Sequence, residues 1–183
     1  DSDGNNLQTI KFPEDSQMYF DYIQDVAVAS NGDLYIADQN KGIYKFNANG
    51  DFVNFFAIYP GGDDTAQRGQ PNRLQIAPNG DLYILSDQAS VYRYTLDGVF
   101  IGSRSLRDSG LSQCNDYSDN ITVGSNGDIY VPCRYSYKVS VYDSELNYKS
   151  ILGGPTGGIR MGMGVVGGLV GAPGLIGGEE NSK

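Results

Sequence analysis

Hydrophobic and polar residues alternate in short runs along most of this chain, and one arrangement of them occurs three times. The copies are DVAVASNGDLYIAD at 25–38, RLQIAPNGDLYILSD at 73–87 and NITVGSNGDIYVPC at 120–133. Asn-Gly between two apolar runs is the strongest short signal for a β-hairpin, because a type I′ turn needs positive φ at both central residues. The pattern therefore predicts three hairpins at a nearly constant period, with their Asn-Gly-Asp turns at 31–33, 79–81 and 126–128.

Each predicted hairpin is followed by two more runs that are typical of strands. The third runs are GIYKFN, SVYRYT and KVSVYD, at 42–47, 90–95 and 138–143. After a second turn the fourth runs are FVNFFA, VFIGSR and YKSILG, at 52–57, 99–104 and 148–153. Four antiparallel strands repeated with a period of this size predict an all-β fold, a β-propeller of four-stranded antiparallel blades.

The repeated pattern resembles the NHL repeat. In both, an apolar strand leads to NGD-aliphatic-Tyr, and an Ile/Val-Tyr strand and an NGD-Phe strand follow. Six-bladed propellers of this kind include gluconolactonase-like and amidating-lyase-like enzymes. The resemblance covers 25 to about 154, and the loop GGDDTAQRGQPN at 61–72 also resembles an inter-blade loop of that family. It implies blades at about 25–72, 73–118 and 119–154, with a partial blade at 1–24. Propellers host many unrelated activities, so the resemblance implies a fold more than a function.

The number of blades stays open. Three copies are fewer than the four blades that the smallest closed propellers contain. The propeller region at 1–154 is therefore expected to supply three blades, or four if the C-terminal segment forms a degenerate one. The other two explanations are that the chain is part of a longer protein and that several chains share one ring.

The composition changes abruptly after the third copy. Between 153 and 178 the chain is rich in glycine, and its one charged residue is Arg160. The Gly-rich tail at 155–183 is interpreted either as an assembly segment that inserts into a neighbouring subunit, or as a degenerate blade or linker. Its glycine content weakens both helix formation and hydrophobicity, which argues against a membrane span.

Charge narrows the class of partner. The net charge is −9, with 13 Lys and Arg against 22 Asp and Glu. Nucleic-acid binding needs a basic surface that displaces counterions, so a nucleic-acid partner is not expected. Acidity fits a secreted, extracellular or periplasmic protein whose partner is a protein, a glycan or another copy of this chain. Membrane contact is not expected.

The two cysteines bear on the compartment. Cys133 ends the second strand of the third hairpin, across from about residue 119, and Cys114 lies in the loop that feeds this hairpin. The loop can fold back to bridge them, so a Cys114–Cys133 disulfide is predicted for an exported protein. The alternative is two free thiols. Asn120-Ile-Thr122 is a glycosylation sequon by pattern, but its place in an inner strand argues against modification.

The chain contains no histidine. This excludes a Ser-His-Asp triad, a Cys-His dyad and a His-ligated zinc or copper site within the chain. The amidating-lyase-like relatives use a His-ligated zinc, so that activity is not expected from this chain alone. Whether the chain is an enzyme stays open, with the balance toward a non-enzymatic role.

Oxygen ligands remain, and these suit Ca²⁺ or Mg²⁺. In propellers the ligand site usually lies where inner strands begin and second strands end, at one mouth of the channel. The candidate metal ligands at such positions are Asp25, Asp38, Asp87 and Asn120. The competing interpretation is that Asp38 and Asp87 cap turns within the repeat. No cofactor is assigned with certainty, and calcium is the ion that the residues would suit.

Candidate ligand-binding residues are strand-end arginines and aromatic residues outside the repeat, because binding residues concentrate in loops. They are Tyr59, Arg73, Tyr117, Arg134, Tyr135 and Tyr137. By contrast, Tyr35, Tyr83 and Tyr130 recur at equivalent places and are interpreted as inter-blade packing.

The leading functional prediction is a non-enzymatic extracellular binding or scaffold protein that self-assembles through open blade edges and its Gly-rich tail. Incomplete blade sets leave strand edges and apolar faces that favour pairing with another chain. The alternative is part of a lactonase-like or other hydrolase-like propeller enzyme, with a divalent cation held by Asp and Asn at the channel mouth.

Overall fold

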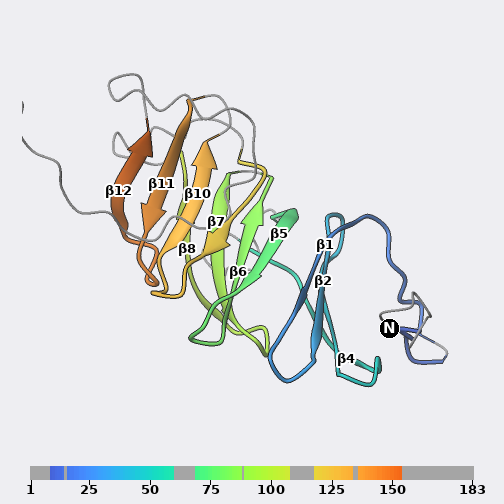
Figure 1. Ribbon diagram of the computed structural model, residues 1–183. Coiled ribbons are helices and arrows are strands. Elements are labelled where there is room, and N and C mark those ends of the chain that lie inside the picture. The colour runs from blue at the N-terminus through green and yellow to red at the C-terminus, as the bar shows by residue number, and fades with distance from the viewer. Residues whose placement is uncertain are drawn as a thin grey trace, which may run out of the picture.

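A computed structural model describes residues 9–14, 16–59, 69–87, 89–107, 118–133 and 136–153 (Figure 1). The first sheet holds β1 (Ile23–Val28), β2 (Leu34–Asp38), β3 (Gly42–Phe46) and β4 (Phe52–Phe56). The second holds β5 (Pro71–Ile76), β6 (Asp81–Ser86), β7 (Ser90–Thr95) and β8 (Phe100–Ser105). The third holds β9 (Thr122–Val123), β10 (Ile129–Cys133), β11 (Lys138–Tyr142) and β12 (Tyr148–Gly153).

Each sheet is an antiparallel meander in which neighbours in sequence are neighbours in space. The four-stranded units follow the predicted repeat, so the fold is that of β-propeller blades. The Gly-rich tail at 155–183 and residues 1–8 lie outside the described residues.

The three Asn-Gly-Asp hairpins form where they were predicted, but with a different turn. Gly32, Gly80 and Gly127 have φ values of +88°, +86° and +81°, whereas the asparagines before them do not have positive φ. In the first hairpin Gly32 N–H donates to Ala29 O at 2.9 Å, and Ala29 N–H donates to Asp33 O at 2.8 Å. This is a type I turn followed by a glycine bulge rather than a type I′ turn. The asparagine side chain explains the choice, because Asn31 Oδ1 accepts a hydrogen bond from Asp33 N–H at 3.0 Å.

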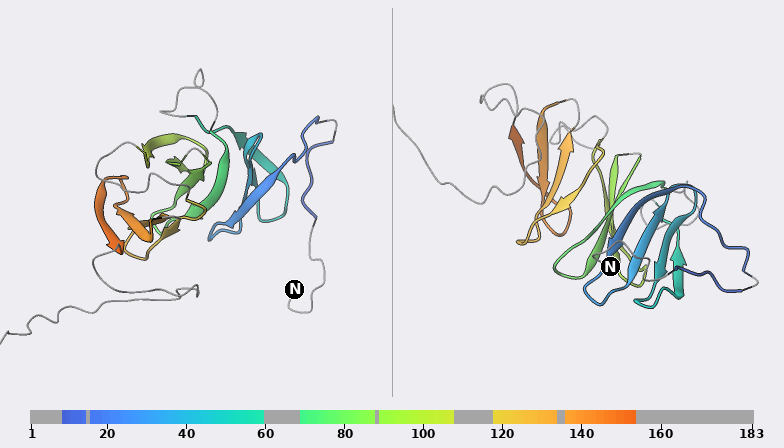
Figure 2. Two further views of the ribbon diagram at one scale, coloured as in Figure 1. Left: turned by 90° about the horizontal axis from the view of Figure 1, so that it is seen from above. Right: turned by 45° about the vertical axis from the view of Figure 1, so that its right-hand side comes forward.

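The three sheets stack face to face in chain order (Figure 2). The inner strand β1 contacts β5, and β5 contacts β9. One apolar core lies between the first and second sheets and includes Tyr35, Ile43 and Leu82. A second lies between the second and third sheets and includes Tyr83, Leu85 and Ile129. As predicted, the repeated tyrosines Tyr35 and Tyr83 lie between blades.

The outer face of the first sheet, which points away from the second sheet, is covered in part by the segment at 9–20. Phe12 and Phe20 pack on Tyr44 and Phe46, with the Phe12 ring centroid 5.4 Å from that of Tyr44 and 5.5 Å from that of Phe46. The segment therefore takes the place of a neighbouring blade over the outer strands. Among the described residues none covers the apolar side chains of the inner strand β1, where Val26 and Val28 are exposed.

Candidate functional site

The predicted metal and ligand residues belong to the loop edge of the blades, defined as the edge where β1 and β5 begin and β2 and β6 end. Asp38 is fully buried there, at the end of β2. Its Oδ2 accepts hydrogen bonds from Asp21 N–H at 2.6 Å and Tyr22 N–H at 3.2 Å, and its Oδ1 accepts one from Asn40 N–H at 3.1 Å. Both carboxylate oxygens thus bind backbone donors, which is the arrangement of a turn cap.

Asp25 joins the first two blades at the same edge. Its Oδ1 accepts a hydrogen bond from Val26 N–H at 2.9 Å, and its Oδ2 accepts one from Leu74 N–H of β5, also at 2.9 Å. An acidic side chain on one inner strand therefore pairs with the backbone of the next inner strand. This cross-strand bond fixes the height of the second blade relative to the first.

The equivalent positions of the other blades carry Arg73 and Asn120. Asn120 Oδ1 accepts a hydrogen bond from Ile121 N–H at 2.9 Å, as Asp25 does from its own neighbour. The Arg73 guanidinium donates to Asn72 O and Asn72 Oδ1, both at 2.8 Å. Asp87 is half-buried after β6, and its N–H donates to Gln70 O at 3.0 Å.

Within the described residues no group of three or more Asp, Glu, Cys or His side chains is placed to hold a metal ion. The oxygens of Asp25 and Asp38 accept backbone hydrogen bonds instead. The calcium site therefore stays a prediction, and the geometry on the described part of the chain assigns these two residues to blade structure.

The predicted ligand-binding residues are scattered. Tyr137 lies in the β10–β11 loop, is almost fully exposed and has a φ of +56°. Tyr59 is half-buried, and its N–H donates to the Tyr94 hydroxyl at 3.3 Å. The candidates outside the described residues are Tyr117, Arg134 and Tyr135.

Cys133 is buried at the end of β10, with its Sγ 3.7 Å from Ser140 Oγ. Its predicted partner Cys114 lies outside the described residues, so the disulfide stays a prediction.

A row of amides at the loop edge was not foreseen. Gln24 Nε2 donates to Gln39 Oε1 at 2.9 Å, and Gln39 Nε2 donates to Gln70 Oε1 at 3.5 Å. Beside the row, Asn40 Nδ2 donates to Asp21 Oδ2 at 3.0 Å, and the Tyr22 ring is exposed. The available sequence signal was weak, because these glutamines do not recur with the repeat.

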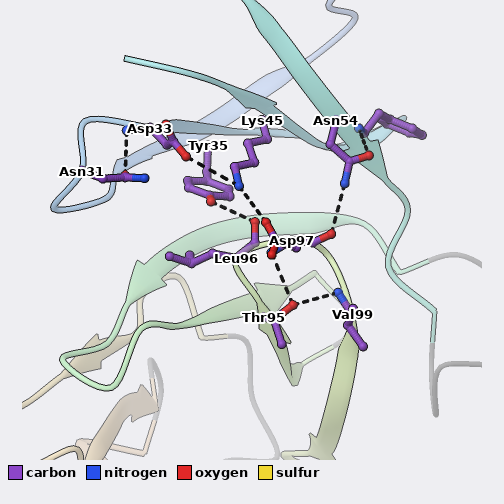
Figure 3. A network of polar contacts seen from close by, with 10 residues as sticks. Asn31, Asp33, Tyr35, Lys45, Asn54, Thr95, Leu96, Asp97 and Val99 are labelled. Carbon is purple, nitrogen blue, oxygen red and sulfur yellow. Dashed lines mark hydrogen bonds and ion pairs between the residues drawn. The ribbon is translucent and has the colours of Figure 1, made fainter.

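The opposite edge of the blades, which carries the Asn-Gly-Asp turns, contains a second unforeseen feature (Figure 3). Lys45 of β3 binds Asp33 of its own blade at 3.5 Å and Asp97 of the next blade at 3.0 Å. The Tyr35 hydroxyl donates to Leu96 O at 2.9 Å in the same next-blade turn. We call this arrangement the inter-blade clamp. It consists of an acid, a tyrosine and a cation of one blade, here Asp33, Tyr35 and Lys45, that hold the turn of the following blade.

The second and third blades are joined by the same clamp. Arg93 of β7 binds Asp81 at 2.7 Å and Glu145 of the third blade at 2.6 Å. The Tyr83 hydroxyl donates to Ser144 O at 2.7 Å. The interval along the chain from the cation to its next-blade acid is the same in both clamps, and this constant spacing is the signal that sequence reasoning missed.

Burial makes the clamp tyrosines weak acids. Desolvation by burial raises the pKa of Tyr35 and Tyr83 above the ordinary tyrosine value. For Lys45 burial opposes the charged form and is the largest single influence, but the hydrogen bonds to Asp97 and Tyr35 together with the nearby negative charge outweigh it, so the lysine pKa is raised. The Asp97 side chain is 85% exposed, so this ion pair contributes little to stability. The buried tyrosine hydrogen bond is the stronger part of the clamp.

The third blade departs from this pattern. Val141 occupies the position of Lys45 and Arg93, and Asp128 binds Lys149 of β12 at 2.7 Å instead. The clamp tyrosine remains as Tyr130, which is half-buried.

A shallow pocket of about 340 Å³ lies between the turns of the second and third blades. Its lining is Ala77, Pro78, Asn79, Ser125, Asn126, Gly127 and Ser144. The lining has no charged or aromatic side chain, so it offers none of the groups expected of a catalytic or sugar-binding site.

No family model matches the chain, and no curated protein matches it. Solved structures do match. A Bacteroides fragilis protein inferred to be exported aligns with 76% of this chain at 18% identity and a TM-score of 0.55. A Bacteroides caccae protein of unknown function aligns with 71% at 14% identity and a TM-score of 0.50, and virginiamycin B lyase from Staphylococcus aureus aligns with 70% at 17% identity and a TM-score of 0.51.

These likenesses concern the fold, and they agree with the propeller blades described above. The aligned part covers 39%, 45% and 40% of the three structures, so the chain spans about two fifths of their length. Within the part of the chain that the structure describes, no helix is long and apolar enough to span a membrane.

Proposed function

We propose that this chain is an exported, non-enzymatic scaffold or binding module of NHL-like propeller blades that associates with a second copy of itself. The observation that carries the proposal is that the acidic, cationic and tyrosine side chains of the described blades make structural contacts. Asp25 and the clamp residues hold blades together, and Asp38 caps a turn within the first blade, while strand β1 presents an exposed apolar surface. The likeness to an inferred exported protein supports the compartment.

The β1 surface consists of Ile23, Val26 and Val28 on the inner strand of the first sheet. Val26 is 48% exposed and Val28 is 64% exposed. At the position equivalent to Val26, the other blades carry Leu74 and Ile121, which are 2% and 1% exposed because a preceding blade covers them. A contiguous exposed apolar surface of this kind marks an interaction site.

A second copy of the chain suits this surface because it would present the same exposed apolar residues for the contact. Two β1 surfaces related by a twofold axis form an isologous contact, which is the commonest arrangement in soluble oligomers. Strand β1 is also an edge of the first sheet, and such edges readily pair with another chain.

The test is the solution mass of the full chain by light scattering across a range of concentrations. We expect a species above the 19.8 kDa of one chain that dissociates on dilution. Val26→Asp combined with Val28→Asp should shift the mass to one chain, because charge on the contact is costly when it is buried.

Val99→Asp is the matched control, since Val99 is exposed to a similar degree but lies on the β7–β8 turn. It should leave the mass unchanged. A wild-type chain that stays at one chain mass at every concentration would refute the self-association.

The alternative, part of a lactonase-like or other hydrolase-like enzyme with a divalent cation, has less support because its predicted ligands Asp25 and Asp38 accept backbone hydrogen bonds. Stabilisation by Ca²⁺ that disappears in Asp87→Ala would favour it. A glycan partner would use the exposed Tyr22 and the glutamine row, and loss of glycan binding in Tyr22→Ala would identify it.

A further inference from the structure

The Asn-Gly pairs in the turns of the blades differ in a way that affects their chemistry. They are Asn31-Gly32, Asn49-Gly50, Asn79-Gly80 and Asn126-Gly127, and all four asparagines are exposed. Asparagine before glycine loses its side-chain amide readily, because glycine has no side chain to hinder attack by its backbone nitrogen. In all four turns the glycine N–H donates to a carbonyl at 2.9 Å. Opening that bond is therefore a cost that the four sites share, and the asparagine side chains decide between them.

In three of these turns, including the Asn31 turn described above, the asparagine side chain holds the turn. Asn79 Oδ1 accepts a hydrogen bond from Asp81 N–H at 3.1 Å, and Asn79 Nδ2 donates to Asp81 Oδ2 at 2.8 Å. Asn126 makes the same two bonds to Asp128, at 3.1 Å and 2.9 Å. These bonds fix the position of the side-chain amide, so they must break before the amide carbon can react.

The fourth turn differs because another residue holds it. Asn47 Oδ1 accepts hydrogen bonds from Asn49 N–H at 2.9 Å and from Asp51 N–H at 3.0 Å. Asn47 Nδ2 also donates to Asp51 Oδ2 at 3.2 Å. The Asn49 side chain makes no hydrogen bond to any residue that the structure describes. It can therefore bring its amide carbon to the Gly50 nitrogen without loss of a side-chain bond.

The equivalent turn of the second blade shows that an aspartate fits at this position. Asp97 of the β7–β8 turn stands where the first blade has Asn49. Thr95 Oγ1 accepts hydrogen bonds from Asp97 N–H at 3.3 Å and from Val99 N–H at 3.1 Å. This is the pattern that Asn47 makes in the first blade. A change from asparagine to aspartate at residue 49 therefore needs no change of the turn.

The same change is unfavourable at Asn79 and Asn126. There it would replace an amide that donates to Asp81 or Asp128 by a second carboxylate. Like charges at hydrogen-bonding distance repel. Both the freedom of the side chain and the stability of the product thus favour Asn49.

We propose that Asn49 is a deamidation site at which this chain acquires a clamp acid by reaction with water. The Gly50 backbone nitrogen loses its proton and forms a bond to Asn49 Cγ, the Cγ–Nδ2 bond breaks, and ammonia leaves with that proton. Water then opens the resulting succinimide ring. Addition of water at Cγ gives aspartate, and addition at the α-carbonyl carbon gives isoaspartate. The net change consumes one water and releases one ammonia, so no oxidant or reductant takes part.

The aspartate product has the position of the clamp acids. Asp97 and Glu145 are the acids that bind the cation of the preceding blade. The interval from Asn49 to Asp97 equals the interval from Asp97 to Glu145. The first blade, which is encoded without a clamp acid, thus gains a carboxylate at the place where the later blades carry theirs.

The test is incubation of the full-length folded protein at mildly alkaline pH, followed by peptide mapping with mass spectrometry. Electron-transfer fragmentation separates aspartate from isoaspartate at each site. We expect Asn49 to convert several-fold faster than Asn31, Asn79 and Asn126 in the same sample. Gly50 is the most buried of the four glycines. A rate at Asn49 no faster than at the other sites would show that access to the glycine controls the reaction, and would overturn the proposal.

Two controls separate the structure from the dipeptide. In the urea-unfolded chain the four rates should converge, because each site is then the same Asn-Gly pair. Persistence of the folded-state order in urea would overturn the role of the turn. Asp128→Ala should accelerate Asn126, whose amide loses its acceptor, and leave Asn49 unchanged.

A matched pair of variants tests the product. Asn49→Asp should leave the midpoint of thermal unfolding unchanged, because the turn already accommodates an aspartate in the second blade. Asn126→Asp should lower the midpoint by several degrees, because it places two carboxylates together. Equal losses in the two variants would contradict the fit of an aspartate at residue 49.

Discussion

The turn glycines of this chain have two separate functions, and only one of them is visible in the sequence. Gly80 has a φ of +86°, and a Cβ there would meet no atom within 4 Å. Gly98, in the β7–β8 turn, has a φ of +85°, and a Cβ there would lie 2.6 Å from Phe56 Cδ1 of the first blade. Gly98 thus serves both the turn and the close approach of two blades.

Replacement of each glycine by alanine separates these effects. Gly80→Ala should destabilise the fold by about 1–2 kcal/mol, the cost of a left-handed backbone with a side chain. Gly98→Ala should cost about 1–3 kcal/mol more, because the blade contact must also shift. Urea unfolding of both variants measures the difference. Equal losses would mean that Phe56 moves aside without cost.

Asp38 illustrates how far sequence reasoning reaches at a single residue. Its position at the end of the second strand was predicted, together with two competing roles. The carboxylate binds the backbone of Asp21 and Tyr22, which belong to a segment without repeat or periodicity. No local pattern could predict this contact, because it depends on where the chain returns to the sheet.

Asp38→Ala should therefore destabilise the chain by about 2–3 kcal/mol, since it leaves part-buried backbone donors without an acceptor. Asp38→Asn keeps one acceptor oxygen and should lose about half as much. Chemical unfolding with and without Ca²⁺ measures both effects, and calcium should make no difference. A normal stability in Asp38→Asn together with loss of a calcium effect would support the metal role instead.

At the scale of the element, the strands were predictable and their connections across blades were not. Asn-Gly-Asp and alternating apolar residues located every hairpin, and β-former runs located the third and fourth strands. The clamps join side chains of different blades that are far apart in sequence, so their partners become recognisable only when the blade stacking is known. The segment at 9–20, predicted as part of a preceding blade, contributes the Phe12 and Phe20 cap, and in the part that the structure describes its backbone pairs with the sheet at an isolated bridge between Lys11 and Asp51.

The clamp hydrogen bond can be tested by removing one hydroxyl. Tyr35→Phe should cost about 1 kcal/mol, because the part-buried Leu96 carbonyl loses its donor. The same change at Tyr130 should have little effect, since the described residues offer its hydroxyl no next-blade turn. Thermal unfolding of the two variants compares them, and a larger loss at Tyr130 would contradict this account of the clamp.

At the scale of the whole molecule, stability is expected to respond to alkali rather than to neutral pH. Burial raises the pKa of five tyrosines, which are Tyr35, Tyr44, Tyr83, Tyr92 and Tyr94. A raised folded-state pKa means that the folded chain holds protons that the unfolded chain has lost. The stabilisation is therefore complete below the unfolded tyrosine pKa near 10 and is lost as the pH rises above it.

We expect a flat stability profile between about pH 6 and 8, because the chain contains no histidine. Above about pH 10 stability should fall by up to about 1.4 kcal/mol per pH unit for each buried tyrosine. Urea unfolding at a series of pH values, followed by tyrosinate absorbance, measures this. Ionisation of all tyrosines before unfolding begins would contradict the burial of these rings.

The clamps also determine which blade unit could be duplicated to add a further blade to the chain. In each clamp the cation lies on the earlier blade and the acid on the later one. Among the three units only the second carries both parts, Arg93 and Asp97, since the first has Asn49 in the acid position and the third has Val141 in the cation position. A tandem duplication of the second unit would place the Arg93 of one copy beside the Asp97 of the next. It would therefore add a blade whose every new junction is already ion-paired, whereas a duplicated first or third unit would create a junction that lacks one partner.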